Sequence, residues 1–419
     1  MKLLLKQAKI IDSTSKFNNK KKDILIENGH IVRIEENLDV KEGYEVVESK
    51  NLHVSKGWID LKSHFCDPGH EYKETVETGL EKAAQGGFSQ VVVLPSTAPV
   101  MDHKASIDSV LKKAETSPVT VIPMGCLTKE MKGRELAELY DMQSAGAKIF
   151  TDDTTNTTVS VLNNALMYAK NFQGKIAVSI GNAALSKNTQ VNEGEASLRT
   201  GLKGDPEVSE IMEIEAYLRV LEYSKGVLHI SGVSTKEGAQ LIAQAKKKGL
   251  NVTADVHIMN VCFDESEVVN FDTRFKTQPP LRSLSNMNAM WEALESGAID
   301  CVVSNHRPTD SDEKEVDFEN ATFEGPQLQT VFPALNTFGA LPQSKLIEIL
   351  CERPASVLNI EIQSIALDTE ANLTIFDPDE KFDSDSLQYN DKSYTAFDLS
   401  ALTGRVIGIV HAGKYKKTT

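Results

Sequence analysis

GWIDLKSHF, residues 57–65, is the first of eight short hydrophobic runs that recur along the chain. The other seven are FSQVVVLPST (88–97), VTVIPMGCL (119–127), AKIFTDD (147–153), GKIAVSIGN (174–182), GVLHISGVS (226–234), NVTADVHIM (251–259) and DCVVSNHRP (300–308). Between them lie helical patterns such as residues 209–223, where Ile211, Ile214, Leu218 and Leu221 share one face. Hydrophobic strands that alternate with amphipathic helices indicate parallel pairing with both sheet faces covered. The pattern predicts a (β/α)8 TIM barrel over residues 56–355. The rival is an open doubly wound sheet, but no Gly-x-Gly-x-x-Gly follows any run.

The two ends of the chain have a different pattern. Residues 1–55 and 356–419 show short alternating strands and turns, as in KDILIENGHIVRIEE (22–36) and GRVIGIVHAGK (404–414). Because the ends of a chain often lie close together, we expect both segments to pair into one small β-sandwich domain beside the barrel.

Composition and charge narrow the class of protein. The 419 residues are 40% hydrophobic and 25% charged, with a formal net charge of −15. An acidic chain disfavours nucleic acid and anionic membranes as partners. No hydrophobic run approaches the roughly 18 residues that span a bilayer. The 5 cysteines are scattered without a Cys-x-x-Cys motif, which is typical of a reducing compartment and predicts a cytoplasmic protein.

Polar residues gather where the predicted barrel strands end. In a barrel of this type, chemistry takes place at the carboxyl ends of the strands. The residues there are Lys62, His64, Cys66, Ser96, Asp152, Asp153, Ser179, Gly232, His257, Asn305 and His306. Three connections at the same face, residues 180–206, 259–284 and 306–326, are longer than ordinary loops. We therefore expect the functional site at this face.

Several blocks of sequence, in order, carry a resemblance to a known family. They include DPGHEYKETVETGLEKAAQGGFSQVVVLPSTAP (67–99), NEGEASLRTGLKGDP (192–206), FKTQPPLRS (275–283), ERPASVL (352–358) and GRVIGIVHAGK (404–414). In these blocks the chain resembles the dihydroorotases, amidohydrolases that occur alone in bacteria or joined to aspartate transcarbamoylase. The resemblance implies a site with one or two Zn²⁺ ions that polarise a cyclic amide and activate water.

The same resemblance implies that most of the zinc ligands are missing. The family's ligand positions fall on Lys62, His64, Asp153, Ser179, Gly232 and Asn305. Only His64 and Asp153 keep a type that binds zinc, so they are the residual metal candidates. Asn305 stands where the family has its general base, and an amide has no basic lone pair near neutral pH. The family's substrate-binding arginine, asparagine and histidine are replaced here by Cys66, Ser96 and Thr309.

Lys62 offers a different use for the altered site. We predict that its ammonium group lies within about 6 Å of the Asp153 carboxylate and stands in for the missing metal, an attraction of roughly 4 kcal/mol before desolvation. Asp152 is also expected to form ion pairs in the barrel mouth, and His229 to be buried structure. Two alternatives remain. His257 and His306 could join His64 and Asp153 in a rearranged mononuclear site, or Cys66 could act as a nucleophile with His64 as its base.

These inferences favour a dihydroorotase-like protein of pyrimidine biosynthesis that lacks activity, a pseudoenzyme that needs no cofactor. The family resemblance implies an assembly role, with aspartate transcarbamoylase or a second copy of the chain as partner. The alternative is an active zinc-dependent dihydroorotase, which hydrolyses dihydroorotate to carbamoyl aspartate, with a rearranged site. A third hypothesis is a sensor whose barrel mouth binds an anionic pyrimidine precursor, although the loss of the arginine counts against it.

Overall fold

The eight hydrophobic runs form one parallel sheet in the computed structural model, which describes residues 1–39, 42–153, 157–382 and 394–418. In chain order the strands are β6 (Trp58–Ser63), β7 (Phe88–Val93), β8 (Thr120–Gly125), β9 (Ile149–Phe150), β10 (Lys175–Ser179), β13 (Leu228–Ser231), β14 (Val252–His257) and β15 (Cys301–Val303). Each strand pairs with the next one along the chain. The sheet closes where Ser63 bridges His306 and the His64 amide donates to the His306 carbonyl at 2.9 Å. The predicted barrel is confirmed.

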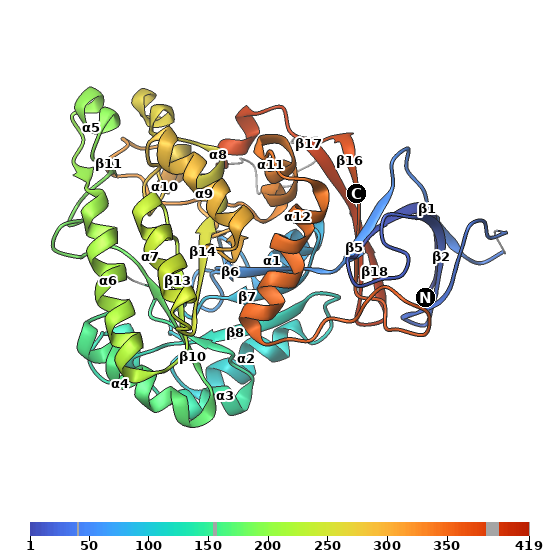
Figure 1. Ribbon diagram of the computed structural model, residues 1–419, viewed down its shortest axis with the longest axis horizontal. Coiled ribbons are helices and arrows are strands. Elements are labelled where there is room, and N and C mark those ends of the chain that lie inside the picture. The colour runs from blue at the N-terminus through green and yellow to red at the C-terminus, as the bar shows by residue number, and fades with distance from the viewer. Residues whose placement is uncertain (40–41, 154–156, 383–393, 419) are drawn as a thin grey trace.

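Helices surround the strands on the outside (Figure 1). Between the strands run α1 (Val76–Gln85), α2 (Lys104–Ala114), α3 (Leu139–Ala145), α4 (Val159–Ala169), α6 (Glu207–Ser224), α7 (Lys236–Lys247) and α9 (Leu284–Ser296), and after β15 come α11 (Val331–Phe338), α12 (Gln343–Ile347) and α13 (Arg353–Leu358). Every residue of β6 and β7 is buried. This burial explains why these strands read as continuous hydrophobic runs rather than as an alternation.

The two ends of the chain pair into a second, curled sheet at one side of the barrel (Figure 1). Its strands are β1 (Lys2–Ile11), β2 (Lys21–Glu27), β3 (His30–Glu35), β4 (Glu45–Val47), β5 (His53–Lys56), β16 (Leu373–Lys381), β17 (Thr403–His411) and β18 (Lys414–Lys417). The ends are joined where β16 pairs antiparallel with β5, with Thr374 opposite Ser55. The sheet has a hydrophobic core of its own, which includes Leu3, Ile24 and Ile375. The expected pairing of the termini is therefore confirmed.

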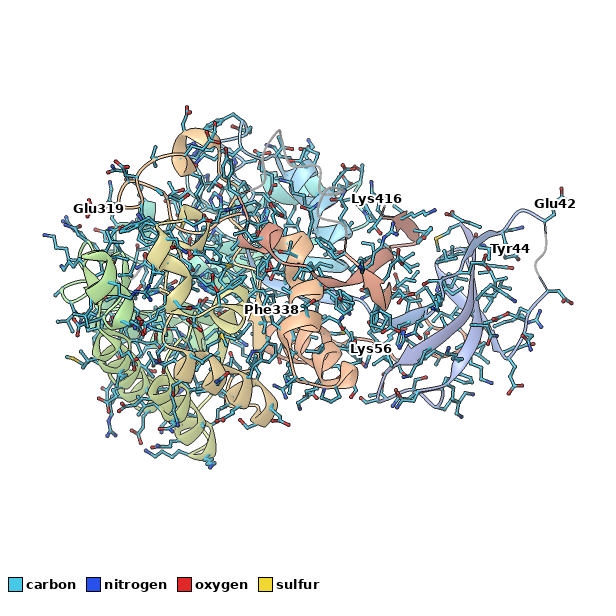
Figure 2. All side chains as sticks on the ribbon, turned by 90° about the horizontal axis from the view of Figure 1, so that it is seen from above. Glu42, Tyr44, Lys56, Glu319, Phe338 and Lys416 are labelled. Atoms are coloured by element: carbon cyan, nitrogen blue, oxygen red, sulfur yellow. The ribbon has the colours of Figure 1, made fainter. Side chains whose placement is uncertain are left out.

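Two contacts fix this sheet against the barrel. The Trp58 ring at the start of β6 packs against both Phe332 of α11 and Phe376 of β16, with ring centroids 4.8 and 5.4 Å away. Figure 2 shows Lys56 at the junction, and its ammonium lies 3.1 Å from Asp12 and 3.0 Å from Glu352. The barrel is therefore anchored at the strand that begins the candidate site.

The three long connections contain short elements. Residues 180–206 include β11 (Val191–Asn192), α5 (Glu195–Thr200) and β12 (Gly204–Asp205), 259–284 includes most of α8 (Ile258–Cys262), and 306–326 includes α10 (Ser311–Lys314). The structure does not describe residues 40–41, 154–156, 383–393 and 419, which belong to the predicted terminal segments (1–55 and 356–419) and the predicted barrel (56–355). None of the described helices combines the length and hydropathy needed to cross a bilayer.

Candidate functional site at the barrel mouth

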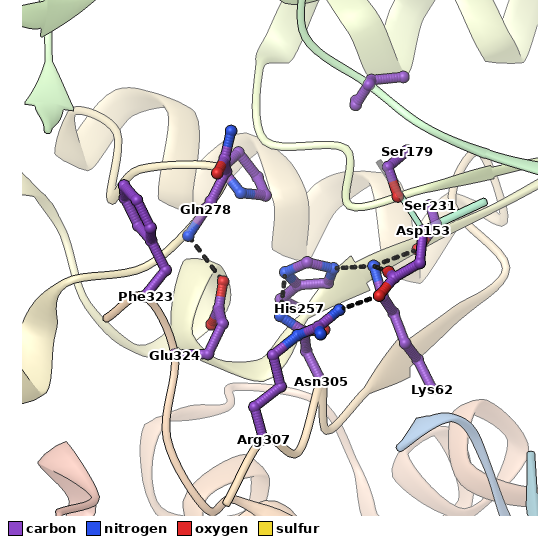
Figure 3. Close-up of a pocket in the computed structure, with 12 residues that line it drawn as sticks. Lys62, Asp153, Ser179, Ser231, His257, Gln278, Asn305, Arg307, Phe323 and Glu324 are labelled. Carbon is purple, nitrogen blue, oxygen red and sulfur yellow. Dashed lines mark hydrogen bonds and ion pairs between the residues drawn. The ribbon is translucent and has the colours of Figure 1, made fainter. Parts of the chain in front are cut away.

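A cavity of about 400 Å³ opens at the carboxyl ends of the barrel strands (Figure 3). Its lining is Lys62, Asp153, Ser179, Ile180, Ser231, His257, Gln278, Pro279, Asn305, Arg307, Phe323 and Glu324. Of the residues predicted at this face, His64, Cys66, Ser96, Asp152, Gly232 and His306 do not line the cavity, and neither does Thr309. The structure therefore divides the predicted site residues into a group at the cavity and a group behind it.

Lys62 occupies the centre of the first group. Its ammonium nitrogen lies 3.2 Å from Ser231 Oγ, 3.4 Å from His257 Nε2 and 3.8 Å from Asp153 Oδ1. The side chain is only 7% exposed. The lysine therefore sits among groups from β13, β14 and the end of β9, and the predicted approach to Asp153 is present in the structure.

The Asp153 carboxylate lies close to two cations, Lys62 and Arg307, rather than to Lys62 alone. Arg307 Nη2 lies 2.6 Å from Asp153 Oδ2, and Ser96 Oγ donates to the same oxygen at 3.0 Å. Burial opposes ionisation of Asp153, but the charges of Arg307 and Lys62 outweigh it and lower the pKa of the carboxyl. Asp153 has φ of +49°, a backbone conformation that Asp and Asn adopt more readily than most residues. This turn aims its side chain into the mouth.

Asp152 points away from the mouth, so the expectation that it forms ion pairs there is wrong. Its Oδ1 accepts from the amides of Leu127 and Thr128, each at 2.9 Å, and its Oδ2 accepts from Thr128 Oγ1 at 2.5 Å. Burial raises the pKa of this carboxyl. Asp152 serves to fix the loop after β8 and has no contact with a cation among these partners.

His64 has both ring nitrogens engaged behind the cavity. Nε2 lies 3.0 Å from the Ser96 carbonyl, to which it donates, and Nδ1 accepts from the Cys66 amide at 3.1 Å. Burial, followed by the charge of Arg307, lowers the pKa of His64 to about 4. The ring is therefore neutral and carries no free lone pair for a metal.

Cys66 does not have the surroundings of a nucleophile. Its sulfur lies 3.2 Å from His64 Nδ1, the nitrogen that already accepts from the Cys66 amide. Burial, followed by the charge of Glu74, raises the pKa of the thiol to about 12. Since the thiolate is the reactive form, the alternative in which Cys66 attacks a substrate is not supported.

His257 is neutral beside the ammonium group. Burial, followed by the charge of Lys62, lowers its pKa to about 3. Because Nε2 faces the ammonium donor, the ring proton belongs on Nδ1, which lies 3.2 Å from the Asn305 amide group. We assign the Asn305 oxygen to that contact, since an amide nitrogen would bring two donors together. Asn305 is 2% exposed, and its other amide atom has no partner among the residues that the structure describes.

His306 is held outside the mouth. Its Nε2 lies 2.8 Å from Glu74 Oε1, and its Nδ1 accepts from the Gln327 amide at 3.0 Å. The rearranged mononuclear site predicted from His64, Asp153, His257 and His306 is therefore not formed by these four residues. His229, as expected, is buried structure, bonded to Asp255 and Thr253 at 2.9 Å each.

Ser179 and Gly232 stand at the remaining ligand positions that the family resemblance implies, and they differ in the side chain and the space found there. Ser179 is half-buried and its hydroxyl lines the cavity. Gly232 has φ of +81°, and a Cβ there would lie 3.0 Å from His257 Nε2 and 3.2 Å from Pro279 Cδ. A histidine at position 232 would therefore need both a strained backbone and the space that His257 fills.

The residues present do not fit zinc. Lys62 brings a positive charge to the place where the site would hold a dication, and His64 spends both nitrogens on other groups. Across the described part of the chain, no three His, Cys, Asp or Glu side chains form a group that could hold a metal ion. No reaction step can be derived through a metal at this site.

Two charged residues of the mouth were missed by the sequence analysis. Arg307 lies within the eighth run, after the end of β15, and binds Asp153, with 27% of its side chain exposed. Glu324 accepts from Thr277 Oγ1 at 2.9 Å and from the Gln278 amide at 2.7 Å, and burial raises its pKa. Arg307 comes two residues after Asn305, and this position at a strand end could have predicted that it lies in the mouth. Nothing in the sequence distinguished Glu324 from the other acidic residues of its loop.

The sequence is similar to proteins of one known family over nearly its whole length. A family model described as Dihydro-orotase-like matches residues 52–238. A dihydroorotase of Ruminiclostridium cellulolyticum is 34% identical over 399 residues, covering 94% of this chain and 93% of the relative. A dihydroorotase of Caldicellulosiruptor saccharolyticus is 33% identical over 423 residues, covering 99% of this chain and 98% of the relative.

Solved structures agree in architecture at lower identity. The L-hydantoinase of Arthrobacter aurescens superposes with a TM-score of 0.82 at 22% identity, covering 99% of this chain and 95% of that one. The D-hydantoinase of a Thermus species gives a TM-score of 0.80 at 22% identity, covering 99% and 94%. At this identity the likeness shows the amidohydrolase fold, a barrel with a β domain, and no more.

Proposed function

This chain belongs to the dihydroorotase family of the amidohydrolase superfamily, and on that premise we propose that it is a dihydroorotase-like protein of cytoplasmic pyrimidine biosynthesis without hydrolase activity. In this proposal it serves as a structural partner of aspartate transcarbamoylase. The barrel and the terminal sheet are what an assembly surface needs, and both are intact. In this protein, as we propose, the fold is retained and the hydrolase reaction is lost.

The observation that carries the proposal is the position of the Lys62 ammonium. It lies within 3.8 Å of Asp153 and 3.4 Å of His257, two mouth groups that could otherwise attract a cation. At about 4 Å and an effective dielectric of about 20, one ammonium repels a dication by roughly 8 kcal/mol. Asp153 is also bound by Arg307 at 2.6 Å. The charge that a metal would supply is thus already provided by two side chains.

Proton transfer and substrate binding lack their groups as well. Asn305 cannot accept a proton near neutral pH, and its amide is turned to His257 at 3.2 Å. Cys66 stands where a guanidinium would grip a carboxylate, and a thiol cannot make that bidentate contact. Each loss affects a different step, so a single substitution is not expected to restore turnover.

The alternative is an active, zinc-dependent dihydroorotase with rearranged ligands. The observation in its favour is that relatives 31 to 34% identical over nearly the whole chain carry the name dihydroorotase. The geometry of His64, His257 and His306 weighs against it, since each ring is engaged elsewhere.

The test combines a turnover assay with an assembly assay. The full chain is incubated with excess Zn²⁺ and assayed for dihydroorotate hydrolysis, with the Ruminiclostridium cellulolyticum relative as the positive control. In parallel it is mixed with aspartate transcarbamoylase from the same source and analysed by size-exclusion chromatography with light scattering. We expect no turnover and a joint complex. Turnover comparable with the control would overturn the loss of activity, and separate elution at micromolar concentrations would overturn the assembly role.

A further inference from the structure

Arg307 brings hydrogen-bond donors to the barrel mouth that the protein does not use. The residue lines the cavity, and its Nη2 donates to Asp153 Oδ2 at 2.6 Å. This is the one side-chain hydrogen bond that Arg307 makes to a described residue. A guanidinium carries several further N–H donors and stays charged at every accessible pH. Most of the donors of this cation are therefore left for a ligand.

Asn305 adds a buried amide group that has no partner in the described part of the chain. The residue is 2% exposed and lines the same cavity. Because its oxygen is assigned to the contact with His257, the group without a partner is the NH2 donor. Burial of an amide without a hydrogen bond is unfavourable. An acceptor that a ligand places here would remove that cost.

Two further donors come from other strand ends. The Lys62 ammonium makes two hydrogen bonds, whereas Asp153 Oδ1, at 3.8 Å, lies beyond hydrogen-bond length. One of its N–H groups is therefore left over. Ser179, at the end of β10, lines the cavity half-buried, and its hydroxyl makes no hydrogen bond to a described residue.

The acceptors of the cavity are already engaged. Glu324 Oε2 accepts from Thr277 Oγ1 at 2.9 Å, and its Oε1 accepts from the Gln278 amide at 2.7 Å. Asp153 Oδ2 accepts from Arg307. The unused polar groups of the mouth are thus mainly donors, some of them on cations. Such a set attracts an electron-rich ligand.

We propose that the barrel mouth binds a small carboxylate, whose carboxylate group lies against Arg307, Asn305 and Ser179. The planar fork of a guanidinium matches the two oxygens of a carboxylate. Figure 3 shows Arg307 and Asn305 between Ser179 on one side of the cavity and Phe323 on the other. An anion then lies where the family resemblance implies a metal cation. The inference does not rest on the assembly role proposed above.

This site differs from the substrate-binding positions that the family resemblance implies. Those positions fall on Cys66, Ser96 and Thr309, and none of the three lines the cavity. The guanidinium here comes from Arg307, after the end of β15, and binds Asp153. The mouth therefore offers a carboxylate a different place, made by different residues.

The charge of the mouth suits one negative charge better than two. Lys62 and Arg307 are the cations, and Asp153 already lies close to both. Burial raises the pKa of Glu324, so a second negative charge close to it is disfavoured. A dianion would bring more buried charge than these cations match. A monocarboxylate is therefore expected to bind more tightly than inorganic phosphate.

The rest of the cavity suits a flat hydrophobic body. Its volume of about 400 Å³ falls within the range of small-molecule sites. Ile180, Pro279 and Phe323 supply its hydrophobic lining. A ring that carries one carboxylate fits this combination of a hydrophobic wall and a cluster of donors.

The test is a fluorine NMR titration of the full chain with 4-fluorobenzoate, with 4-fluorobenzamide as the uncharged match. We expect one saturable site for the carboxylate with a Kd of about 1 mM or lower. The amide should bind at least about tenfold more weakly, because it lacks the charge. Absence of saturable binding, or equal affinity for both compounds, would overturn the proposal. Displacement by inorganic phosphate at lower concentrations than by unlabelled benzoate would overturn the carboxylate class.

Variants assign the binding to the mouth. Arg307→Met should weaken 4-fluorobenzoate binding by at least about tenfold. Arg274→Met is the matched control, because Arg274 is 29% exposed, binds one aspartate at 2.7 Å and does not line the cavity. Its affinity should equal that of the wild type. Equal losses in the two arginine variants would overturn the site.

A second variant decides the matter if Arg307→Met does not fold. Asn305→Asp keeps the shape of the side chain but replaces the donor with a negative charge, so binding should weaken by at least about 100-fold. Unchanged binding in Asn305→Asp would overturn the proposal. None of these titrations involves hydrolysis or the transcarbamoylase. A negative result would therefore overturn this inference alone and leave the proposed function to its own test.

Discussion

Two successive layers inside the barrel are built from the same three strands and are held together very differently. β6, β13 and β14 contribute Asp60, His229 and Asp255 to the lower layer and, two residues later on each strand, Lys62, Ser231 and His257 to the mouth. In the lower layer Asp255 binds His229 at 2.9 Å and the Gly232 amide at 2.8 Å. In the mouth the contacts of Lys62 are 3.2 to 3.8 Å long.

The difference shows which polar groups the fold requires. Asp60 accepts from Ser63 Oγ at 2.5 Å and from Ser304 at both its amide and its hydroxyl, so it joins the first strand to the last. No catalytic role is needed to explain that layer, because it closes the barrel. In the mouth, the Asp153 carboxylate lies near two cations, Lys62 and Arg307, and one buried atom of Asn305 has no partner in the described part of the chain. The lower layer stabilises the barrel, whereas the mouth is free to change.

The largest effect is expected when the charge balance of the mouth is broken. Asp153→Asn keeps the shape and suits the φ of +49°, but it removes the carboxylate that lies 3.8 Å from the Lys62 ammonium and 2.6 Å from Arg307 Nη2. Breaking a buried pair costs about 3 to 5 kcal/mol, and we expect about 3 because Arg307 is 27% exposed. Urea unfolding measures the loss. If the loss in the double variant Lys62→Met, Asp153→Asn equals the sum of the losses in the two single variants, the two residues are not coupled.

The second prediction concerns pH and the histidine of the mouth. Folding lowers the pKa of His257 to about 3, so the unfolded chain binds a proton at this position more readily. Its contribution to stability is full above the unfolded pKa near 6.5 and is lost as the pH falls toward the folded value. We expect the difference in the free energy of unfolding between wild type and His257→Gln to shrink as the pH falls. The expected change is about 1 kcal/mol per pH unit, or about 2 kcal/mol from pH 6.5 to 4.5.

The comparison with His257→Gln is needed because buried carboxyl groups change the pH dependence of the stability in the opposite direction. Burial raises the pKa values of Asp60, Asp152 and Glu324, and such carboxyls favour the folded state as the pH falls through their folded pKa values. They are present in both proteins and cancel in the difference. A difference that stays constant over this pH range would show that His257 is not held neutral.

The third prediction compares one serine from each layer. Ser304→Ala removes a hydroxyl that donates to the buried Asp60 at 2.8 Å, and we expect a loss of about 2 kcal/mol. Ser96→Ala removes a donor to Asp153 at 3.0 Å, but Arg307 binds the same oxygen and the serine is half-buried. We expect about 0.5 kcal/mol there, since water can replace the hydroxyl. Equal losses by urea unfolding would contradict the distinction between the layers.

The sequence predicted the barrel because each strand is a hydrophobic run bounded by polar residues, a pattern that burial on both faces imposes. It also predicted that Lys62 approaches Asp153, since strand ends meet at one rim. It did not predict that Asp152 turns to Leu127 and Thr128, because adjacent residues point in opposite directions and the choice depends on the backbone at Asp153. The second partner of His306, Gln327, lies 21 residues away, and no local pattern connects them.

The most direct test of the central claim, that Lys62 occupies the place of a metal, is the zinc content of the protein after equilibrium dialysis. The chain is dialysed against a tenfold excess of Zn²⁺, then against metal-free buffer, and zinc is measured per chain with the Ruminiclostridium cellulolyticum relative alongside. We expect no stoichiometric zinc in this chain, since Lys62 repels a dication and His64 offers no lone pair. One zinc per chain, lost in Asp153→Asn, would contradict it and show that the mouth recruits a metal despite its lysine.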